Sequence, residues 1–210
     1  SRPSGTRSAA SLLSVAIHSR GGSDAPVVVF LHGLGLLGPR GGDEFLDVWV
    51  ARGFRVLAPD LPGFGASPAL PTEDYRPSRL ARLLLGALPE RFAVVGFSWG
   101  GTIGVHMAVQ AANRLTALVL VDVGYQTPAA PTPYEQQLEQ ARAEAEGMRF
   151  PDEATFLDAA RPHFSARISE TALLASMRKE GGSLVPELTP EIYAGALHGV
   201  EVEPPQPLLG

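Results

Sequence analysis

The sequence predicts an α/β protein with a mainly parallel sheet flanked by helices. Short apolar segments such as Val27–Leu31 and Phe54–Ala58 alternate with helical segments between residues 27 and 121. The apolar segments are continuous rather than alternating, as in strands that are buried on both faces of a parallel sheet. Such an alternation builds right-handed βαβ units, and the resulting sheets bind ligands at the carboxyl ends of their strands.

The first part of the chain is expected to form this sheet and its flanking helices. An edge strand at Leu12–Ser19 precedes a turn at Gly21–Asp24. Pro77 and Pro89 are typical of the start and the end of a helix. The remaining strands are predicted at Val27–Leu31, Phe54–Ala58, Phe92–Val95 and Leu115–Val121, and the helices at Asp43–Arg52, Arg76–Leu88 and Trp99–Ala112.

After Tyr125 the pattern changes to a helical one without a strand signal. Helices are predicted at Tyr134–Met148, Asp152–Ala160, Ser169–Lys179 and Pro190–Leu197. We therefore divide the chain into a core at residues 1–126, a helical insertion at 127–203, and a segment at 204–210 that begins the return to the core.

The composition narrows the functional classes. Of the 210 residues, 45% are hydrophobic and 19% are charged, as in a globular protein with a buried core. The net charge of -5 lacks the basic footprint of a nucleic-acid-binding protein. The absence of cysteine excludes disulfides, thiolate zinc sites and cysteine nucleophiles. No apolar run is long enough for a membrane span or a secretory signal, and we expect a cytoplasmic protein.

A candidate nucleophile lies between a predicted strand and a predicted helix. Gly96-Phe97-Ser98-Trp99-Gly100 matches the G-x-S-x-G motif. The strand-to-helix reversal requires a strained serine, and the flanking glycines remove side chains that would collide across the turn. The following helix N-terminus offers unpaired N–H groups to an oxyanion. The context predicts that Ser98 is the nucleophile.

A competing motif follows the first buried strand. Residues 33–38, Gly-Leu-Gly-Leu-Leu-Gly, match the G-x-G-x-x-G fingerprint of dinucleotide-binding proteins, and Asp60 then stands where the ribose-binding acid is expected. Pro39, Gly41 and Gly42 interrupt the helix that should hold the pyrophosphate. This hypothesis also leaves the motif at Ser98 unexplained. We therefore expect no cofactor and interpret Asp60 as a turn residue whose carboxylate accepts from backbone N–H groups.

Three segments together resemble the α/β-hydrolase superfamily: His32-Gly33 after a buried strand, the run Pro-Asp-Leu-Pro-Gly-Phe-Gly-Ala-Ser at 59–67, and the elbow at Ser98. The resemblance covers residues 12–125, and the helical insertion resembles the superfamily's cap. It implies that the backbone N–H groups of Leu34 and Trp99 stabilise the oxyanion. It also implies that the elbow serine works with an acid and a histidine that follow it in the chain.

No downstream histidine matches that expectation. His106 lies eight residues after Ser98 on the same helix, about 12 Å of helix rise away. His163 is in the insertion, and His198 precedes Gly199 at a predicted helix end. Asp122, directly after the strand Leu115–Val121, is a possible acid. We expect the final strands and helices to be missing, roughly 50–60 residues, so that the strand 115–121 forms an exposed edge.

The sequence thus predicts a serine hydrolase that acts on an ester, thioester, lactone or carbon–carbon bond next to a carbonyl. Its substrate is expected to be a small apolar molecule in a pocket floored by Phe97, Trp99, Leu34 and Leu36. No metal is expected, the oligomeric state stays open, and the 210-residue chain itself is expected to be inactive. The alternative is a non-catalytic protein that binds a small ligand on the same fold.

Overall fold

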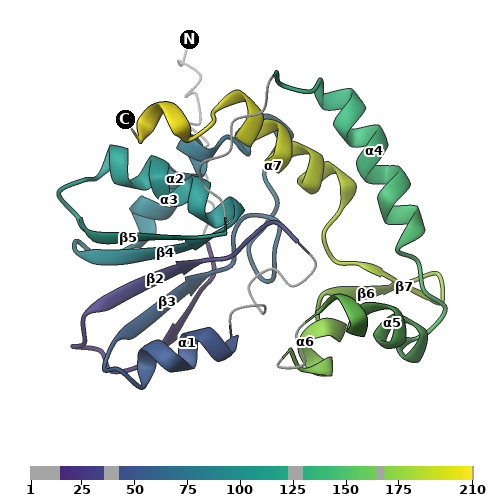
Figure 1. Cartoon of the computed structure of the whole chain (residues 1–210), viewed down its shortest axis with the longest axis horizontal. Helices are drawn as coiled ribbons and strands as arrows, with labels where there is room; N and C mark the ends of the chain where they lie inside the picture. Colours follow the sequence, from purple (N-terminus) through teal and green to yellow (C-terminus); the bar gives the residue numbers. More distant parts are fainter. Residues whose placement is uncertain (1–14, 36–42, 123–129, 165–167, 210) are drawn as a thin grey trace, which may run out of the picture.

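The computed structural model describes residues 15–35, 43–122, 130–164 and 168–209. A five-stranded sheet forms the centre of the core, in the order β1-β3-β2-β4-β5 (Figure 1). The strands are β1 (Ile17–Arg20), β2 (Val27–Leu31), β3 (Arg55–Pro59), β4 (Phe92–Phe97) and β5 (Leu115–Val121). Only β1 runs antiparallel to its neighbour. The mainly parallel sheet is as the sequence predicts.

Helices cover both faces of this sheet. On one face, α1 (Asp43–Val50) places Leu46 against Val28, Val56 and Val95. On the other face, α2 (Pro77–Ala87) and α3 (Trp99–Gln110) pack against each other and bury the larger cluster around Leu80, Leu84 and Ile103. None of the described helices is long and apolar enough to cross a membrane.

Among the described residues β5 forms the outer edge of the sheet, beyond β4. Val119 is 43% exposed and Val121 is 38% exposed, although both belong to an apolar strand. The exposed edge that the sequence predicts beside this strand is therefore present in the structure. An open apolar edge of this kind pairs readily with another strand.

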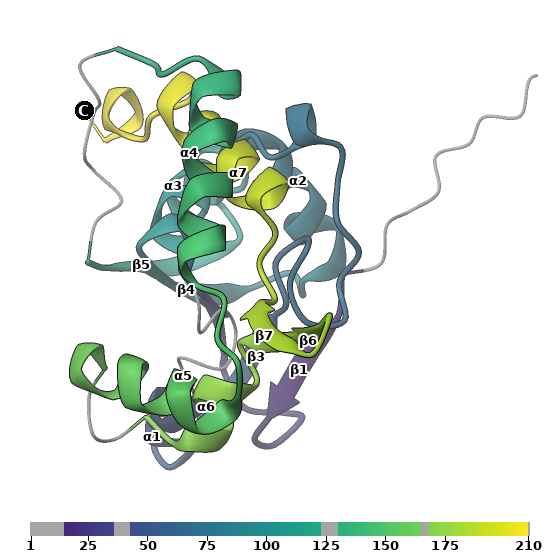
Figure 2. The ribbon, with the colours of Figure 1, turned by 90° about the vertical axis from the view of Figure 1, so that its right-hand side faces the viewer.

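The insertion, residues 130–203, begins with α4 (Tyr134–Gly147) and ends with α7 (Pro190–Val202), which pack side by side (Figures 1 and 2). Ile192 on α7 contacts Gly63 in the loop after β3, so α7 covers the carboxyl end of that strand. Between the two helices lie the short elements α5 (Glu153–Ala160), η3 (Arg161–His163) and α6 (Glu170–Leu174). They share a small apolar cluster of their own around Phe156 and Leu173.

The expectation that the insertion contains no strand is wrong. The predicted helix Ser169–Lys179 ends at Leu174, and β6 (Met177–Glu180) then pairs antiparallel with β7 (Ser183–Pro186). Gly181 and Gly182 connect the strands with φ values of 58° and 82°. Two consecutive residues with positive φ form the tight turn that suits a hairpin, and a glycine pair is its usual sequence signal.

After α7, the side chain and the backbone of Glu203 connect the chain to the core by hydrogen bonds. Glu203 accepts a hydrogen bond from the Ser78 N–H at the start of α2, and its backbone carbonyl accepts from His106 on α3. A short 3-10 helix, η4 (Gln206–Leu208), then lies near α3. The segment that was expected to lead back to the core thus packs against a core helix.

Candidate active site

Ser98 occupies a sharp turn between β4 and α3. Its backbone has φ 49° and ψ -115°, a conformation that non-glycine residues rarely adopt. Hydrogen bonds hold the turn, because the Ser98 N–H donates to the Val121 carbonyl at 2.9 Å and the Ser98 carbonyl accepts from the Gly101 N–H at 2.8 Å. Strain of about 1–3 kcal/mol persists only where surrounding structure imposes it, and such residues cluster at functional sites.

The glycines of the motif are required by close backbone contacts. A Cβ atom on Gly96 would lie 2.6 Å from the Gly100 carbonyl oxygen, and one on Gly100 would lie 2.2 Å from the Leu31 carbonyl oxygen. The N-terminus of α3 therefore rests directly on the carboxyl end of β2. This contact brings the loop after β2 next to the Ser98 turn.

His32 fixes that loop from inside the core. It is 1% exposed. Its Nε2 accepts from the Leu61 N–H at 3.0 Å, so its Nδ1 carries the proton and donates to the Gly33 carbonyl at 2.9 Å. Burial lowers the pKa of His32 to about 4, against the smaller opposing effects of the Gly33 hydrogen bond and Asp60. His32 is thus a neutral residue that orients the Gly33–Leu34 peptide.

The two residues predicted to stabilise an oxyanion lie on either side of Ser98. Gly33 is so close that a Cβ atom on it would lie 3.4 Å from Ser98 Cβ, and Leu34 follows it. Trp99 is the first residue of α3, where backbone N–H groups have no acceptor within the helix. The backbone at Gly33–Leu34 and the first residue of α3 therefore both lie next to Ser98, and the oxyanion role of Leu34 and Trp99 stays a prediction.

The predicted apolar pocket floor is only partly correct. Leu34 lines a cavity, but the Trp99 side chain is 3% exposed and packs in the core beside His32 and Phe64. Phe97 is 40% exposed and covers Gly33. Leu36 lies outside the described residues, as does the second half of the competing glycine fingerprint.

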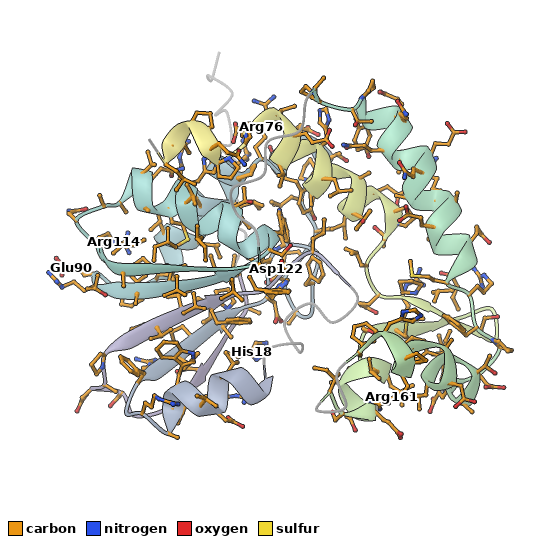
Figure 3. All side chains as sticks on the ribbon, in the orientation of Figure 1. His18, Arg76, Glu90, Arg114, Asp122 and Arg161 are labelled. Carbon is orange, nitrogen blue, oxygen red and sulfur yellow. The ribbon has the colours of Figure 1, made fainter. Side chains whose placement is uncertain are left out.

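Asp122 lies beside the nucleophile turn. Phe97 pairs with Val121 in the β4–β5 register, so Ser98 and Asp122 are the next residues beyond this pair. Asp122 has φ 51°, and with Ser98 it is one of two non-glycine residues with positive φ in the described part of the chain. Figure 3 places it at the end of the sheet that faces the insertion.

Asp60 has the turn role that the sequence predicts. Its Oδ2 accepts from the Ala66 N–H at 2.9 Å, and its Oδ1 lies 2.9 Å from His18 Nε2. Gly65 is essential to this arrangement, because a Cβ atom there would lie 2.2 Å from Asp60 Oδ2. The buried carboxylate thus orders the loop after β3, which carries Leu61, the donor to His32.

All five histidines belong to the described residues, and none forms a hydrogen bond with the Ser98 hydroxyl. His18 and His32 have the partners given above. His106 binds the Glu203 carbonyl at 3.2 Å, and His198 lies 3.1 Å from the Thr132 carbonyl. His163 is exposed two residues after Arg161, which Figure 3 shows far from Asp122. The expectation that no histidine of this chain pairs with Ser98 thus agrees with the hydrogen-bond partners of these side chains, and its catalytic meaning stays a prediction.

A cavity of about 180 Å³ opens between the loop after β2 and the insertion. Leu34 and Gly35 form one wall. α4, α7 and the segment between β7 and α7 form the others, and they contribute Glu144 and Tyr193. Sequence reasoning missed these two residues, because they lie 49 positions apart on helices whose packing no motif indicates. In the described part of the chain, no group of three or more acidic or histidine side chains is placed to hold a metal ion.

The sheet order, the strained serine and the His-Gly loop define a hydrolase-type α/β fold. Residues 26–178 match the family described as alpha/beta hydrolase fold. The chain belongs to this family.

Curated relatives support the same assignment. The chain is 43% identical over 96 residues to a pimeloyl-[acyl-carrier protein] methyl ester esterase of Chromobacterium violaceum. The aligned region covers 46% of this chain and 36% of that protein. It is 35% identical over 155 residues to Esterase Rv0045c of Mycobacterium tuberculosis. This aligned region covers 69% of this chain and 50% of that protein. The chain thus spans half or less of the length of these two relatives.

Solved structures share the fold. A thioesterase domain from the curacin biosynthetic pathway superposes with a TM-score of 0.67 at 24% identity, covering 89% of this chain and 70% of that one. The crystal structure of Esterase Rv0045c superposes with a TM-score of 0.55 at 26% identity, covering 84% of this chain and 64% of that one.

Proposed function

We propose that this chain carries the nucleophile of an ester hydrolase, and that Ser98 is that nucleophile. The observation that carries the proposal is the strained Ser98 turn, held on one side by Val121 and on the other by the contact of Gly100 with β2. The names of the relatives, esterases that include a methyl ester esterase, favour an ester bond. Thioesters, lactones and carbon–carbon bonds next to a carbonyl are the other substrates open to this chemistry.

In the proposed reaction the Ser98 hydroxyl attacks the substrate carbonyl carbon. The carbonyl oxygen then gains negative charge and accepts hydrogen bonds from the N–H groups of Leu34 and Trp99. One such donor contributes about 3 kcal/mol of transition-state stabilisation. The neutral His32 supports the reaction indirectly, because its hydrogen bond to the Gly33 carbonyl orients the peptide that carries the Leu34 N–H.

The proton of Ser98 needs an acceptor, and none of the five histidines of this chain forms a hydrogen bond with its hydroxyl. A serine without a base reacts only through its small alkoxide fraction. The 210-residue chain should therefore react slowly with acylating agents, at a rate proportional to hydroxide. Asp122 is our candidate for the acid that orients the base, because it adjoins Ser98 at the end of the β4–β5 pair.

We assign residues 1–126 to the hydrolase core and 127–203 to a cap over the site. The cavity between Leu34, α4 and α7 supports this division, since it joins the two parts at the loop next to Ser98. The proposed partner is a small, largely apolar ester.

A fluorophosphonate probe tests the proposal on the chain as it stands. We expect slow labelling at Ser98, located by peptide mass spectrometry, with a rate that rises about tenfold per pH unit between pH 7 and 9. Ser98→Ala should abolish the label, and Ser23→Ala, at an exposed turn, should leave it unchanged. Asp122→Asn should not alter labelling in this chain, because an orienting acid acts only through a base.

Two results would contradict the proposal in different ways. A label on another residue of the Ser98→Ala variant, at the parent rate, would remove Ser98 as the nucleophile. A rate that levels off above pH 7.5 would reveal a histidine base within the chain, and His163 would be the first residue to replace. A chain that takes no label at any pH would favour the ligand-binding alternative, which the position of the histidines also supports.

A further inference from the structure

The cavity beside the proposed oxyanion loop has one charged wall. Leu34 and Gly35 line it, and they directly follow Gly33, where a Cβ atom would lie 3.4 Å from Ser98 Cβ, so a substrate whose carbonyl lies at Ser98 has one end near this space. The cavity is therefore placed to receive a substituent of the reacting carbonyl.

Its size sets what that substituent can be. A cavity of about 150 Å³ accommodates a benzene-sized ligand, and this one measures about 180 Å³. It therefore accepts a phenyl ring or a short alkyl chain rather than a whole drug-sized molecule, whose pockets start at about 300 Å³. Met148 and Leu188 make the lining apolar, as such a group requires.

Two polar side chains interrupt this apolar lining, Glu144 on α4 and Tyr193 on α7. Both line the same cavity, and the pKa of Tyr193 is raised first by burial and then by the negative charge of Glu144. Among the described residues that line the cavity there is no lysine, arginine or histidine. The neighbouring Arg142 is engaged with Glu191 at 3.0 Å.

We propose that this cavity binds the uncharged end of the ester substrate, and that Glu144 excludes substrates with a carboxylate or phosphate at that end. That the bound molecule is a substrate rests on the function proposed above, whereas the charge selection is a property of the cavity itself. An anion in the cavity would lose part of its hydration and meet the Glu144 carboxylate, and no described lining residue carries a positive charge that offsets either effect. The Tyr193 hydroxyl remains available to a neutral ester or hydroxyl group.

Binding measured in the Ser98→Ala background tests this selection without turnover. The probes are dimethyl adipate and adipate, which present the same chain with neutral or charged groups at both ends, so either orientation is informative. Ligand-observed NMR titration at pH 7.5 gives both dissociation constants. We expect dimethyl adipate to bind at least about tenfold more tightly than adipate.

The variants then assign the selection to one residue. Glu144→Gln should reduce the preference for the diester roughly three- to tenfold, and Glu144→Lys should reduce it further or reverse it. Glu139→Gln is the matched control, because Glu139 is exposed on α4 as Glu144 is, but it is not one of the residues that line the cavity. It should leave the preference unchanged.

Equal affinity for the two probes would overturn the proposal, as would a preference that Glu144→Gln leaves intact. Failure to bind dimethyl adipate at millimolar concentration would remove the cavity as a ligand site. Each of these results is independent of whether Ser98 takes the fluorophosphonate label, so the selectivity and the nucleophile assignment fail separately.

Discussion

Replacing Gly100 by alanine should open the contact on which the nucleophile turn depends. The new Cβ atom would lie 2.2 Å from the Leu31 carbonyl oxygen and 2.7 Å from the His32 carbonyl oxygen. Both are backbone atoms of β2 and its loop, so neither can rotate away as a side chain does. The N-terminus of α3 must therefore move away from β2 by about 1 Å to restore ordinary van der Waals contact.

The size of the effect follows from that displacement. Overpacking of a core costs about 1–3 kcal/mol, and a clash with backbone belongs at the upper end of this range. For a chain of this length, a loss of about 3 kcal/mol lowers the melting temperature by about 6–12 °C. The Trp99 N–H moves with the helix, and a displacement of about 1 Å in a site costs roughly a hundredfold in rate.

Thermal unfolding and fluorophosphonate labelling measure the two effects separately. The control is Gly86→Ala on α2, where no atom lies within 4 Å of the added Cβ. Alanine there should stabilise the helix by up to about 1 kcal/mol and leave labelling unchanged. If Gly100→Ala melted within about 2 °C of the parent and was labelled at the same rate, the argument from the β2 contact would be refuted.

Two further predictions concern His32 and the insertion. The pKa of His32 is about 4 in the folded chain and 6.5 in the unfolded chain. Between these pH values the unfolded chain therefore binds one more proton than the folded chain. The free energy of unfolding should fall by about 3 kcal/mol as the pH drops from 6.5 to 4. His32→Gln should flatten this slope in urea unfolding, and an unchanged slope would assign it to other groups. Phe156→Ala should cost about 3–5 kcal/mol within the insertion's own cluster. Limited proteolysis should then cut faster between residues 148 and 189, whereas equally faster cutting in the core would argue against a separate cluster.

The sequence predicts the sheet well because its signal is local. Val27–Leu31 and Leu115–Val121 are continuous apolar segments, and their observed bounds equal the predicted ones. The turn at Ser98 is also a local feature, since the strand, the glycines and the helix adjoin in the chain. Even Asp60 could be interpreted correctly, because Ala66, the donor to its carboxylate, is six residues away.

Features that depend on distant partners could not be predicted in the same way. Met177–Glu180 contains three charged residues and no strand pattern, and it becomes a strand by pairing with Ser183–Pro186, which in turn bridges to Phe150. The role of His32 requires the Leu61 N–H, 29 residues later. Such contacts arise from tertiary packing, which overrides local propensity.

The geometry divides the proposed catalytic task between the core and the insertion. Ser98 is held by Val121 on β5, and α3 is held by its Gly100 contact with β2, so residues of the core alone impose the strained turn. Glu144 and Tyr193 come from the insertion and meet the core at Leu34. We therefore expect substitutions in α4 and α7 to change which ester binds without disturbing the Ser98 turn. A chain with this division can acquire a new substrate preference through its insertion while the reaction at Ser98 stays the same.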